Sequence, residues 1–585
     1  MKCQHARSLA FASLLLSIAG CGGPDSGTAP SSTDASSAPG AAQPQPPDGV
    51  PAGTSPLPLP EPGKAYNNPQ PRSNIEDGGT LTLPIGELGP NLNLFSVDGT
   101  TVFVKSITSW LIPQLWDYGI TGGATPNPDF LASVEIVSTE PETVRFTVNP
   151  NAKWNDGTPI DWTAFETTWK TQSGADPRFN PGSSDGYKSI AGVAKGEKDN
   201  EVIVTFKEPF YPIENVFAQL EHPKNADPDF YKTGWVNKMP AELMAGPFTV
   251  ESLTEDRLVL VRNPKWWGDP PKLDTVVYRQ MDDVASVNAF QNGEVDTTTI
   301  TGGRQTADTL KQIGGMKDAQ IRRGFATSTS IYELGNESEL FKDAAARKAF
   351  VLCIDRRLLT QIRYQGMDWR EEAPGSGLIY TWQQGYRNNM ADVRYDPAQA
   401  RAVLDAAGWA MGADGFRYKN GTLAEFRYVT FGDEPVFIAM ARAEQKMAQD
   451  IGLKMNVEVR KTTEFSKTLT QGTFDVVAMS WQADSPFGYA FAWQIYGTTS
   501  ESNFSRVGSA HVDALLGSVV TIRDSAEALR TFNDAEREAL GLYGLFPTMN
   551  GPSQYAVKKG LANFGPSGFL VPNPEDVGWQ KDSPQ

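Results

Sequence analysis

Few residues of this chain have side chains suited to nucleophilic or metal chemistry. The 585-residue sequence has three histidines and three cysteines, which are Cys3, His5, Cys21, His222, Cys353 and His511. His222 precedes a proline in a loop-like segment and His511 begins a helix-like segment, and neither lies in a motif typical of a catalytic triad. Structural zinc sites usually take four Cys or His ligands. The sequence therefore argues against an extracytoplasmic hydrolase and against a zinc protein.

Cys21 has a different kind of chemistry available, which is lipidation. A short basic start is followed by an apolar stretch from Leu9 to Ile18, which is too short to span a bilayer and is typical of a secretory signal. The signal ends in Ile18-Ala19-Gly20-Cys21, which resembles a lipobox. We therefore expect cleavage after residue 20 and a diacylglyceryl group on Cys21, because two acyl chains anchor a protein far better than one.

Residues 21–75 are expected to form a tether between this anchor and a folded body. They are rich in Gly, Ser, Ala, Thr and Pro and have few large apolar residues, so they cannot bury enough surface to fold. The rest of the chain, from about residue 76, contains no segment predicted to cross a membrane and is long enough for several domains. The net charge of −17 argues against nucleic acid as a partner, because such binding requires a basic surface.

The body alternates short apolar β runs with longer helical segments, which is typical of an α/β or mixed architecture. Helix is predicted for the amphipathic segment from Pro435 to Ile451, which Gly452 would terminate. A second helix is predicted after Asp396-Pro397, and two more near the C-terminus at about 510–522 and 526–542. The strands predicted most clearly are 80–85, 144–148, 202–206, 258–262, 275–278, 455–459 and 474–479.

Several motifs together resemble a known family. In chain order they are KWNDGTPI (153–160), GPF (246–248) with RNPKWW (262–267), QNGEVD (291–296) and FVLCIDRRL (350–358). Each is weak alone, but their order and spacing extend over nearly all of the body. The chain is identified as similar to the extracytoplasmic solute-binding proteins of peptide- and nickel-type ABC importers, family 5, and most similar to actinobacterial oligopeptide-binding lipoproteins.

The resemblance implies an α/β fold of two lobes that close over a ligand, in the manner of the large class II periplasmic binding proteins. A small additional domain decorates the first lobe. Carried onto this sequence, lobe I comprises residues 76–108, 221–310 and 543–585, the additional domain 109–220, and lobe II 311–542. The resemblance also implies a monomer that binds a solute and a membrane permease, with no cofactor, metal or catalytic residue.

Asp484 and Trp481 are the first candidate ligand-binding residues. They end the segment TFDVVAMSWQAD (473–484), and in peptide-binding relatives the matching W-x-A-D carries an aspartate that pairs with the α-ammonium of the peptide. A carboxylate in a closed cleft recognises that group whatever the peptide sequence, through a charge-assisted hydrogen bond. The alternative role for Asp484 is an exposed turn residue, and the alternative for Trp481 is core packing.

The other candidates come from looser matches to the family. They are Phe465, which matches a cleft tryptophan, Asp98, Tyr187, and Trp110, which could face either ligand or core. One position departs from the family pattern, because relatives often carry an arginine three residues before the tryptophan and this chain has Ala478. An ion pair between an arginine and a peptide carboxylate is therefore not predicted at that position.

Three functions remain open from the sequence. The first is a receptor that captures oligopeptides and delivers them to an ABC permease. The second keeps the fold but binds another solute, such as a sugar, a chelate or a glutathione-like molecule, because a fold does not determine its ligand. The third is a lipoprotein that regulates envelope assembly rather than transport.

Overall fold

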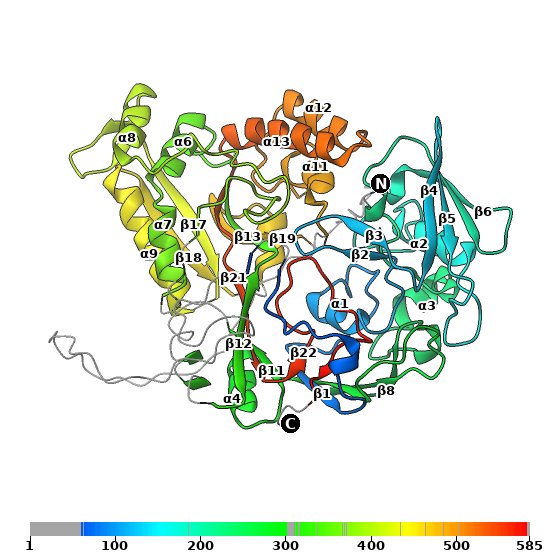
Figure 1. Ribbon diagram of the computed structural model, residues 1–585. Coiled ribbons are helices and arrows are strands. Elements are labelled where there is room, and N and C mark those ends of the chain that lie inside the picture. The colour runs from blue at the N-terminus through cyan, green and yellow to red at the C-terminus, as the bar shows by residue number, and fades with distance from the viewer. Residues whose placement is uncertain are drawn as a thin grey trace.

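The computed structural model describes residues 60–581 of the chain, except 62–63, 185, 301–308, 311, 314–315, 336, 366, 368, 370, 433, 462–463, 484 and 501. Three large hydrophobic cores lie in different parts of the molecule. Figure 1 shows the corresponding arrangement, with the yellow and orange chain on one side, the cyan chain on the other, and blue, green and red segments below.

The first core lies on a four-stranded sheet that joins distant segments. The strand order is β1 (Thr80–Ile85), β10 (Thr275–Gln280), β9 (Arg257–Arg262), β8 (Phe248–Leu253), and only the β1–β10 pair is parallel. Three helices belong to these N-terminal segments, namely α1 (Val102–Thr108), α3 (Pro228–Thr233) and α4 (Asp283–Gln291). A short pair, β22 (Leu561–Ala562) and β23 (Gly578–Trp579), brings the C-terminal segment to the same core.

The second core belongs mainly to residues 115–220, inserted between α1 and β8, and also contains Ala245. An antiparallel sheet of order β4 (Leu131–Thr139), β5 (Glu142–Val148), β7 (Glu201–Phe206), β6 (Ile190–Lys195) packs against α2 (Trp162–Gln172). The pair Asp156-Gly157 of the KWNDGTPI motif precedes α2, whose N-cap Asp161 accepts a hydrogen bond from Thr163 N. A small hairpin of β2 (Trp116–Tyr118) and β3 (Ala124–Pro126) adjoins this region.

The third core lies on a five-stranded mixed sheet. Its order is β18 (Lys454–Arg460), β17 (Glu425–Phe431), β19 (Val476–Gln482), β13 (Ser328–Leu334), β20 (Leu545–Met549). The helices of this part are α6 (Ala344–Cys353), α7 (Arg356–Arg363), α8 (Pro397–Ala406), α9 (Pro435–Asp450), α10 (Phe465–Thr470), α11 (Ala492–Tyr496), α12 (Ala510–Val519) and α13 (Ser525–Gly541). A small antiparallel sheet is formed by β14 (Ala410–Met411), β15 (Arg417–Lys419) and β16 (Thr422–Leu423).

Two chain crossings join the part of the chain around the third core to the part around the first core. A three-stranded sheet of β11 (Thr297–Thr299), β21 (Pro552–Lys558) and β12 (Ala319–Phe325) lies at the junction. From it β12 passes into β13 through residues 326–327, and β20 passes into β21 through residues 550–551. Figure 1 shows β12 and β21 running side by side from the lower part toward β13 and β19. These crossings come later in the chain than the predicted lobe boundaries at 310/311 and 542/543.

Polar contacts fix both crossings. The Tyr380 hydroxyl donates to Thr327 O at 2.5 Å, and Trp382 Nε1 donates to Ala326 O at 3.2 Å. At the second crossing the Glu371 carboxylate accepts the backbone N–H of Asn550 at 3.0 Å and of Gly551 at 2.8 Å. Each crossing is therefore a short segment with defined partners, as expected where two lobes are connected.

Candidate functional site

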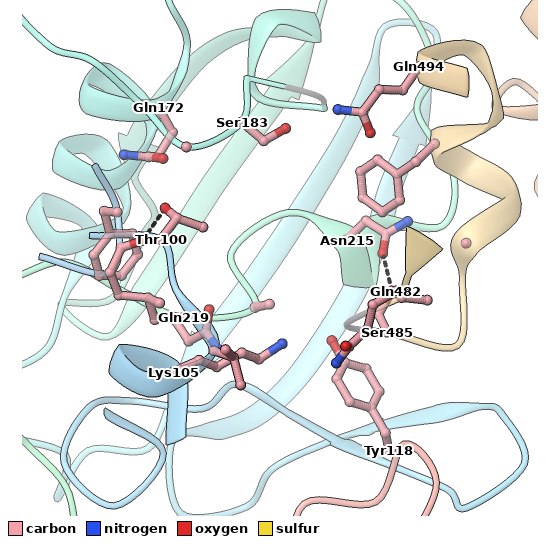
Figure 2. A pocket seen from close by; sticks show the side chains of 18 of the residues that line it. Thr100, Lys105, Tyr118, Gln172, Ser183, Asn215, Gln219, Gln482, Ser485 and Gln494 are labelled. Carbon is pink, nitrogen blue, oxygen red and sulfur yellow. Dashed lines mark hydrogen bonds between the residues drawn. The ribbon is translucent and has the colours of Figure 1, made fainter. Parts of the chain in front are cut away.

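A cavity of about 330 Å³ lies between two parts of the molecule. The first and second regions, which are the chain around the first and second cores, lie on one side, and the third region, around the third core, lies on the other. One wall comes from residues within 94–105, 114–118, 172–183 and 215–219 together with Tyr187, and the opposite wall from residues within 481–483 and 485–495 together with Leu378. Val571, from the C-terminal segment, also lines the cavity. Figure 2 shows the labelled side chains from both walls facing one space. A pocket between two lobes of a receptor is a usual place for a small-molecule ligand.

The polar lining consists almost entirely of neutral amides and hydroxyls. These are Thr100, Thr101, Gln114, Gln172, Ser183, Asn215, Gln219, Gln482, Ser485 and Gln494. Such groups both donate and accept hydrogen bonds, so they can bind a ligand of alternating N–H and C=O groups. Among the described lining residues, Lys105 has the only charged side chain.

Aromatic side chains provide the apolar part of the lining. They are Phe95, Trp116, Tyr118, Tyr187, Trp481 and Phe491. Aromatic rings give a large, flat contact area that accommodates apolar groups of different shape. The combination suits a ligand with a polar backbone and variable side groups.

Strand β19 positions the wall of the third region. It pairs with β13, with Trp481 opposite Thr329 and Gln482 opposite Ser328, so the last residues of β19 reach the cavity. Trp481 is 4% exposed, and its ring stacks against Phe504 at a centroid distance of 6.2 Å. Trp481 therefore both lines the cavity and packs in the core, and its binding of ligand stays a prediction.

Several contacts join the two walls beside the cavity. Ser485 Oγ donates to Asn215 Oδ1 at 3.1 Å, as Figure 2 shows. The rings of Tyr118 and Phe487 meet edge to face at 6.3 Å. Farther away, Tyr211 N donates to Val520 O at 2.8 Å. The walls therefore touch directly in this conformation.

Tyr187, the loosest of the sequence candidates, lies in the lining. Its hydroxyl oxygen accepts the backbone N–H of Phe217 at 3.0 Å, and its ring meets the Phe217 ring edge to face at 5.4 Å. Burial by the surrounding protein raises the pKa of the hydroxyl, so the group is neutral at physiological pH. Tyr187 can offer ring area and a hydroxyl without a charge.

Three other candidates lie outside the lining. Trp110 is buried beside Phe248, and its Nε1 donates to the Tyr278 hydroxyl at 2.8 Å. Asp98 is exposed and accepts a hydrogen bond from Asn180 at 3.2 Å. Phe465 packs against Phe431 at 4.8 Å.

Ala478, where relatives carry arginine, is also absent from the described lining. Asp484 and Cys21 lie outside the residues that the structure describes. Their roles therefore stay predictions from the sequence.

Most of the polar lining was missed by sequence reasoning. Lys105, Gln114, Asn215, Gln219 and Gln494 come from four separate segments, and no local motif marks any of them. Only their common orientation in the fold brings them together.

His222 and Cys353, two residues with reactive potential, have structural environments. His222 Nδ1 accepts the N–H of Lys224, its Nε2 lies 3.2 Å from Asp156 Oδ2, and burial lowers its pKa. Cys353 is buried in the third core, which raises the pKa of its thiol. Within the described ranges, no cluster of three His, Cys, Asp or Glu residues has the arrangement of a metal site.

Comparison with known proteins identifies the family. Residues 125–503 match the model of the bacterial extracellular solute-binding proteins, family 5, middle region. The chain belongs to this family. The oligopeptide-binding protein OppA of Mycobacterium tuberculosis strain H37Rv is 32% identical over 511 residues, which cover 86% of this chain and 85% of that protein. Family 5 proteins are extracytoplasmic substrate receptors rather than enzymes, so this chain is a receptor.

Solved structures of family 5 proteins share the fold. The periplasmic EDTA-binding protein EppA has a TM-score of 0.80 at 24% identity, covering 88% of this chain and 98% of its own. The oligopeptide-binding protein AppA of Bacillus subtilis, solved with a nonapeptide, has a TM-score of 0.71 at 19% identity, covering 87% and 100%. The predicted two-lobed α/β fold is thereby confirmed. Across the described part of the chain, no helix has the length and apolarity needed to span a membrane.

Proposed function

We propose that this family 5 protein captures peptides in the cavity between its lobes and delivers them to the permease of an ABC importer. The observation that carries this proposal is the lining of neutral amides and hydroxyls, supplied by both walls and interleaved with aromatic rings. A peptide backbone alternates donors and acceptors, and its side chains vary, so it requires this combination. The 32% identity to a protein named for oligopeptide binding supports the same ligand class.

The proposal includes a lipid anchor at Cys21 with residues 21–75 as a tether. The lipobox-like sequence and the composition of the segment that follows it support this part. An anchored receptor stays close to the permease, which raises its effective concentration there. The receptor is proposed to act as a monomer, with lobe I and the additional domain on one side of the cavity and lobe II on the other.

Asp484 is proposed to bind the α-ammonium group of the peptide. We expect Asp484→Ala to weaken peptide binding by about tenfold or more, because removing one partner of a buried charged hydrogen bond costs several kcal/mol. Isothermal titration calorimetry measures the change. Asp392→Ala is the matched control, since the Asp392 side chain is 85% exposed and pairs with the exposed Arg537 at the surface. Equal affinities of Asp484→Ala and the unaltered protein would contradict the assignment.

Native mass spectrometry of the purified protein tests the function itself. We expect a mixture of co-purifying short peptides, and a rise in melting temperature on adding a peptide library, because a ligand that binds only the folded state stabilises it. A single defined non-peptide solute would overturn the peptide proposal in favour of another cargo. An empty protein that no peptide stabilises would favour a regulatory role in envelope assembly.

A further inference from the structure

Gln172 lines the cavity and is held from behind by a buried hydrogen-bond network. It is the last residue of α2 and is 5% exposed. Figure 2 shows it on the same wall as Thr100 and Ser183. Behind it lies Glu221, which is 1% exposed and whose Oε1 accepts a hydrogen bond from Gln172 Nε2 at 3.1 Å. A buried carboxyl group therefore supports the cavity wall at this place.

Two acceptors determine which end of the Gln172 amide faces inward. A glutamine amide has a donating nitrogen and an accepting oxygen of nearly the same shape. Besides the bond to Glu221, Gln172 Nε2 donates to the Tyr231 hydroxyl oxygen at 3.4 Å. This hydroxyl donates its own hydrogen to Phe95 O at 2.7 Å, so it acts as an acceptor toward Gln172. The reverse orientation would place the amide oxygen against these acceptors, so the nitrogen faces inward.

The rest of the network fixes the direction of its hydrogen bonds. Trp235 Nε1 can only donate, and it donates to Asn225 Oδ1 at 3.0 Å. The nitrogen of the Asn225 amide is thereby directed to Glu221 Oε2, to which it donates at 2.9 Å. Glu221 N donates to Thr168 Oγ1 at 2.9 Å, which holds the backbone of Glu221 in place. Both carboxyl oxygens of Glu221 therefore accept hydrogen bonds from amide nitrogens.

This direction is the same whether or not Glu221 carries a proton. Burial raises the pKa of Glu221 to about 8, so the group is neutral near pH 7. The proton can lie in the hydrogen bond between Glu221 Oε1 and the Thr171 hydroxyl, because Thr171 can donate its own hydrogen to Thr168 O at 3.1 Å. Glu221 Oε1 then keeps a lone pair for Gln172 Nε2.

The oxygen of the Gln172 amide is left for the cavity. No donor from the described part of the chain bonds to Gln172 Oε1, and this atom is not among the buried polar atoms that the protein encloses without a partner. Because the nitrogen is committed inward, the cavity presents a hydrogen-bond acceptor at this position. A ligand gains from it by placing an N–H there.

We propose that Gln172 accepts a hydrogen bond from a backbone N–H of the bound peptide and that Glu221 is the residue that positions the Gln172 amide for it. This inference rests on the proposed peptide-binding function and deepens it. Proline has no backbone N–H. The cavity should therefore reject peptides that carry proline at the residue that Gln172 contacts.

Replacing single backbone N–H groups of the ligand tests the inference. The probes are a library of tetrapeptides and three matched libraries, in each of which one peptide bond is an ester, so that oxygen replaces N–H. The melting temperature and the apparent affinity of the purified full chain are measured with each library. We expect one ester library to bind about tenfold more weakly or worse, because Gln172 Oε1 is then left without a donor. This comparison uses the unaltered protein and does not depend on any variant folding.

Variants then assign the penalty to the two residues. Gln172→Met removes the amide at similar length, so that ester and amide should bind equally. Glu221→Gln should also abolish the penalty, because Asn225 selects the oxygen of the new amide and its nitrogen then faces Gln172, whose oxygen turns inward. Gln449→Met on α9 and Glu538→Gln on α13 are the matched controls, since both positions are exposed. They should keep the full penalty.

The outcomes separate this inference from the proposed function. If no ester library binds more weakly than the peptide library, the Gln172 inference is wrong and the peptide function stands. A penalty that persists in Gln172→Met overturns the assignment to Gln172. A penalty that is lost in Gln172→Met but persists in Glu221→Gln overturns the positioning role of Glu221. If the peptide library does not raise the melting temperature, the peptide function fails, and the inference that rests on it fails as well.

Discussion

Tyr187 shows how one residue can serve both the cavity and the fold. Its ring lines the cavity, and its hydroxyl oxygen accepts the N–H of Phe217. Phe217 is fully buried and has a φ of 56°, in the left-handed region that non-glycine residues seldom adopt. The hydrogen bond that the Phe217 N–H donates to the tyrosine therefore satisfies the backbone at a place where the chain is already strained.

Removing this hydroxyl should destabilise the protein. We expect Tyr187→Phe to lower the free energy of unfolding by about 1–3 kcal/mol, because the N–H of Phe217 would be left buried without an acceptor. Urea unfolding measures the loss. Tyr395→Phe is the matched control, since Tyr395 is 50% exposed, and its change should stay within about 0.5 kcal/mol. Equal losses in the two variants would contradict the structural role of the Tyr187 hydroxyl.

At the residue scale, the sequence predicted the aromatic part of the site better than the polar part. Trp481 could be found because it ends a recognisable strand in a family motif, and Tyr187 from a loose match. Trp110 could not be assigned, because both a core and a ligand site accept a tryptophan. Lys105 was missed because nothing near it in the sequence indicates that α1 directs it across a cavity.

Among the elements, the crossing between β20 and β21 imposes a strict local requirement. Gly551 has a φ of 80°, and a Cβ at this position would lie 1.9 Å from the Tyr364 hydroxyl oxygen. Its N–H also donates to Glu371. The crossing therefore requires both the backbone freedom and the small volume of glycine.

Gly551→Ala should accordingly reduce stability by about 2 kcal/mol or more, from backbone strain combined with the overlap. Gly517→Ala makes the same chemical change in the last turn of α12, where a Cβ would meet nothing within 4 Å. There we expect a gain of up to about 1 kcal/mol, because alanine is the better helix former. Unfolding curves of both variants in urea measure the difference. A Gly551→Ala protein as stable as the parent would show that the crossing adapts to a side chain.

Individual elements were predictable from sequence where their patterns are local. The strand predicted at 80–85 is β1, and the helix predicted from Pro435 is α9, followed by Gly452 with a φ of 86°. Their assembly was not predictable in this way. The parallel pairing of β1 with β10, for example, joins Thr80 to Thr275, and no local pattern specifies a partner so distant in the chain. Only the family resemblance supplied the discontinuous lobes.

Over the whole molecule, buried carboxyl groups link stability to pH. Burial raises the pKa of Glu444 to about 7, and of both Glu221 and Glu333 to about 8. The folded protein thus retains protons that the unfolded chain releases above about pH 4.5. Stability from these groups is fully present below that pH and declines as the pH rises through their folded-state pKa values.

The unfolding free energy should therefore be higher at pH 5 than at pH 8. Glu444 alone should contribute roughly 3 kcal/mol of this decline, from a shift between 4.5 and about 7. Glu444→Gln should flatten the pH profile by that amount, since a neutral amide cannot titrate. Glu538→Gln, at an exposed position of α13, should leave the profile unchanged. Urea midpoints at several pH values measure both, and parallel profiles for the two variants would contradict the linkage.

The contacts between the two walls of the cavity also determine how fast a bound ligand can dissociate. Ser485 bonds to Asn215, and Tyr118 meets Phe487, beside a space that both lobes enclose. A bound solute can escape only after these contacts separate, so the dissociation rate constant is limited by the frequency of lobe opening. Cargoes of different affinity would then share a similar upper limit on their release rate. A partner that separates the lobes would accelerate the release of all of them, without having to recognise any particular one.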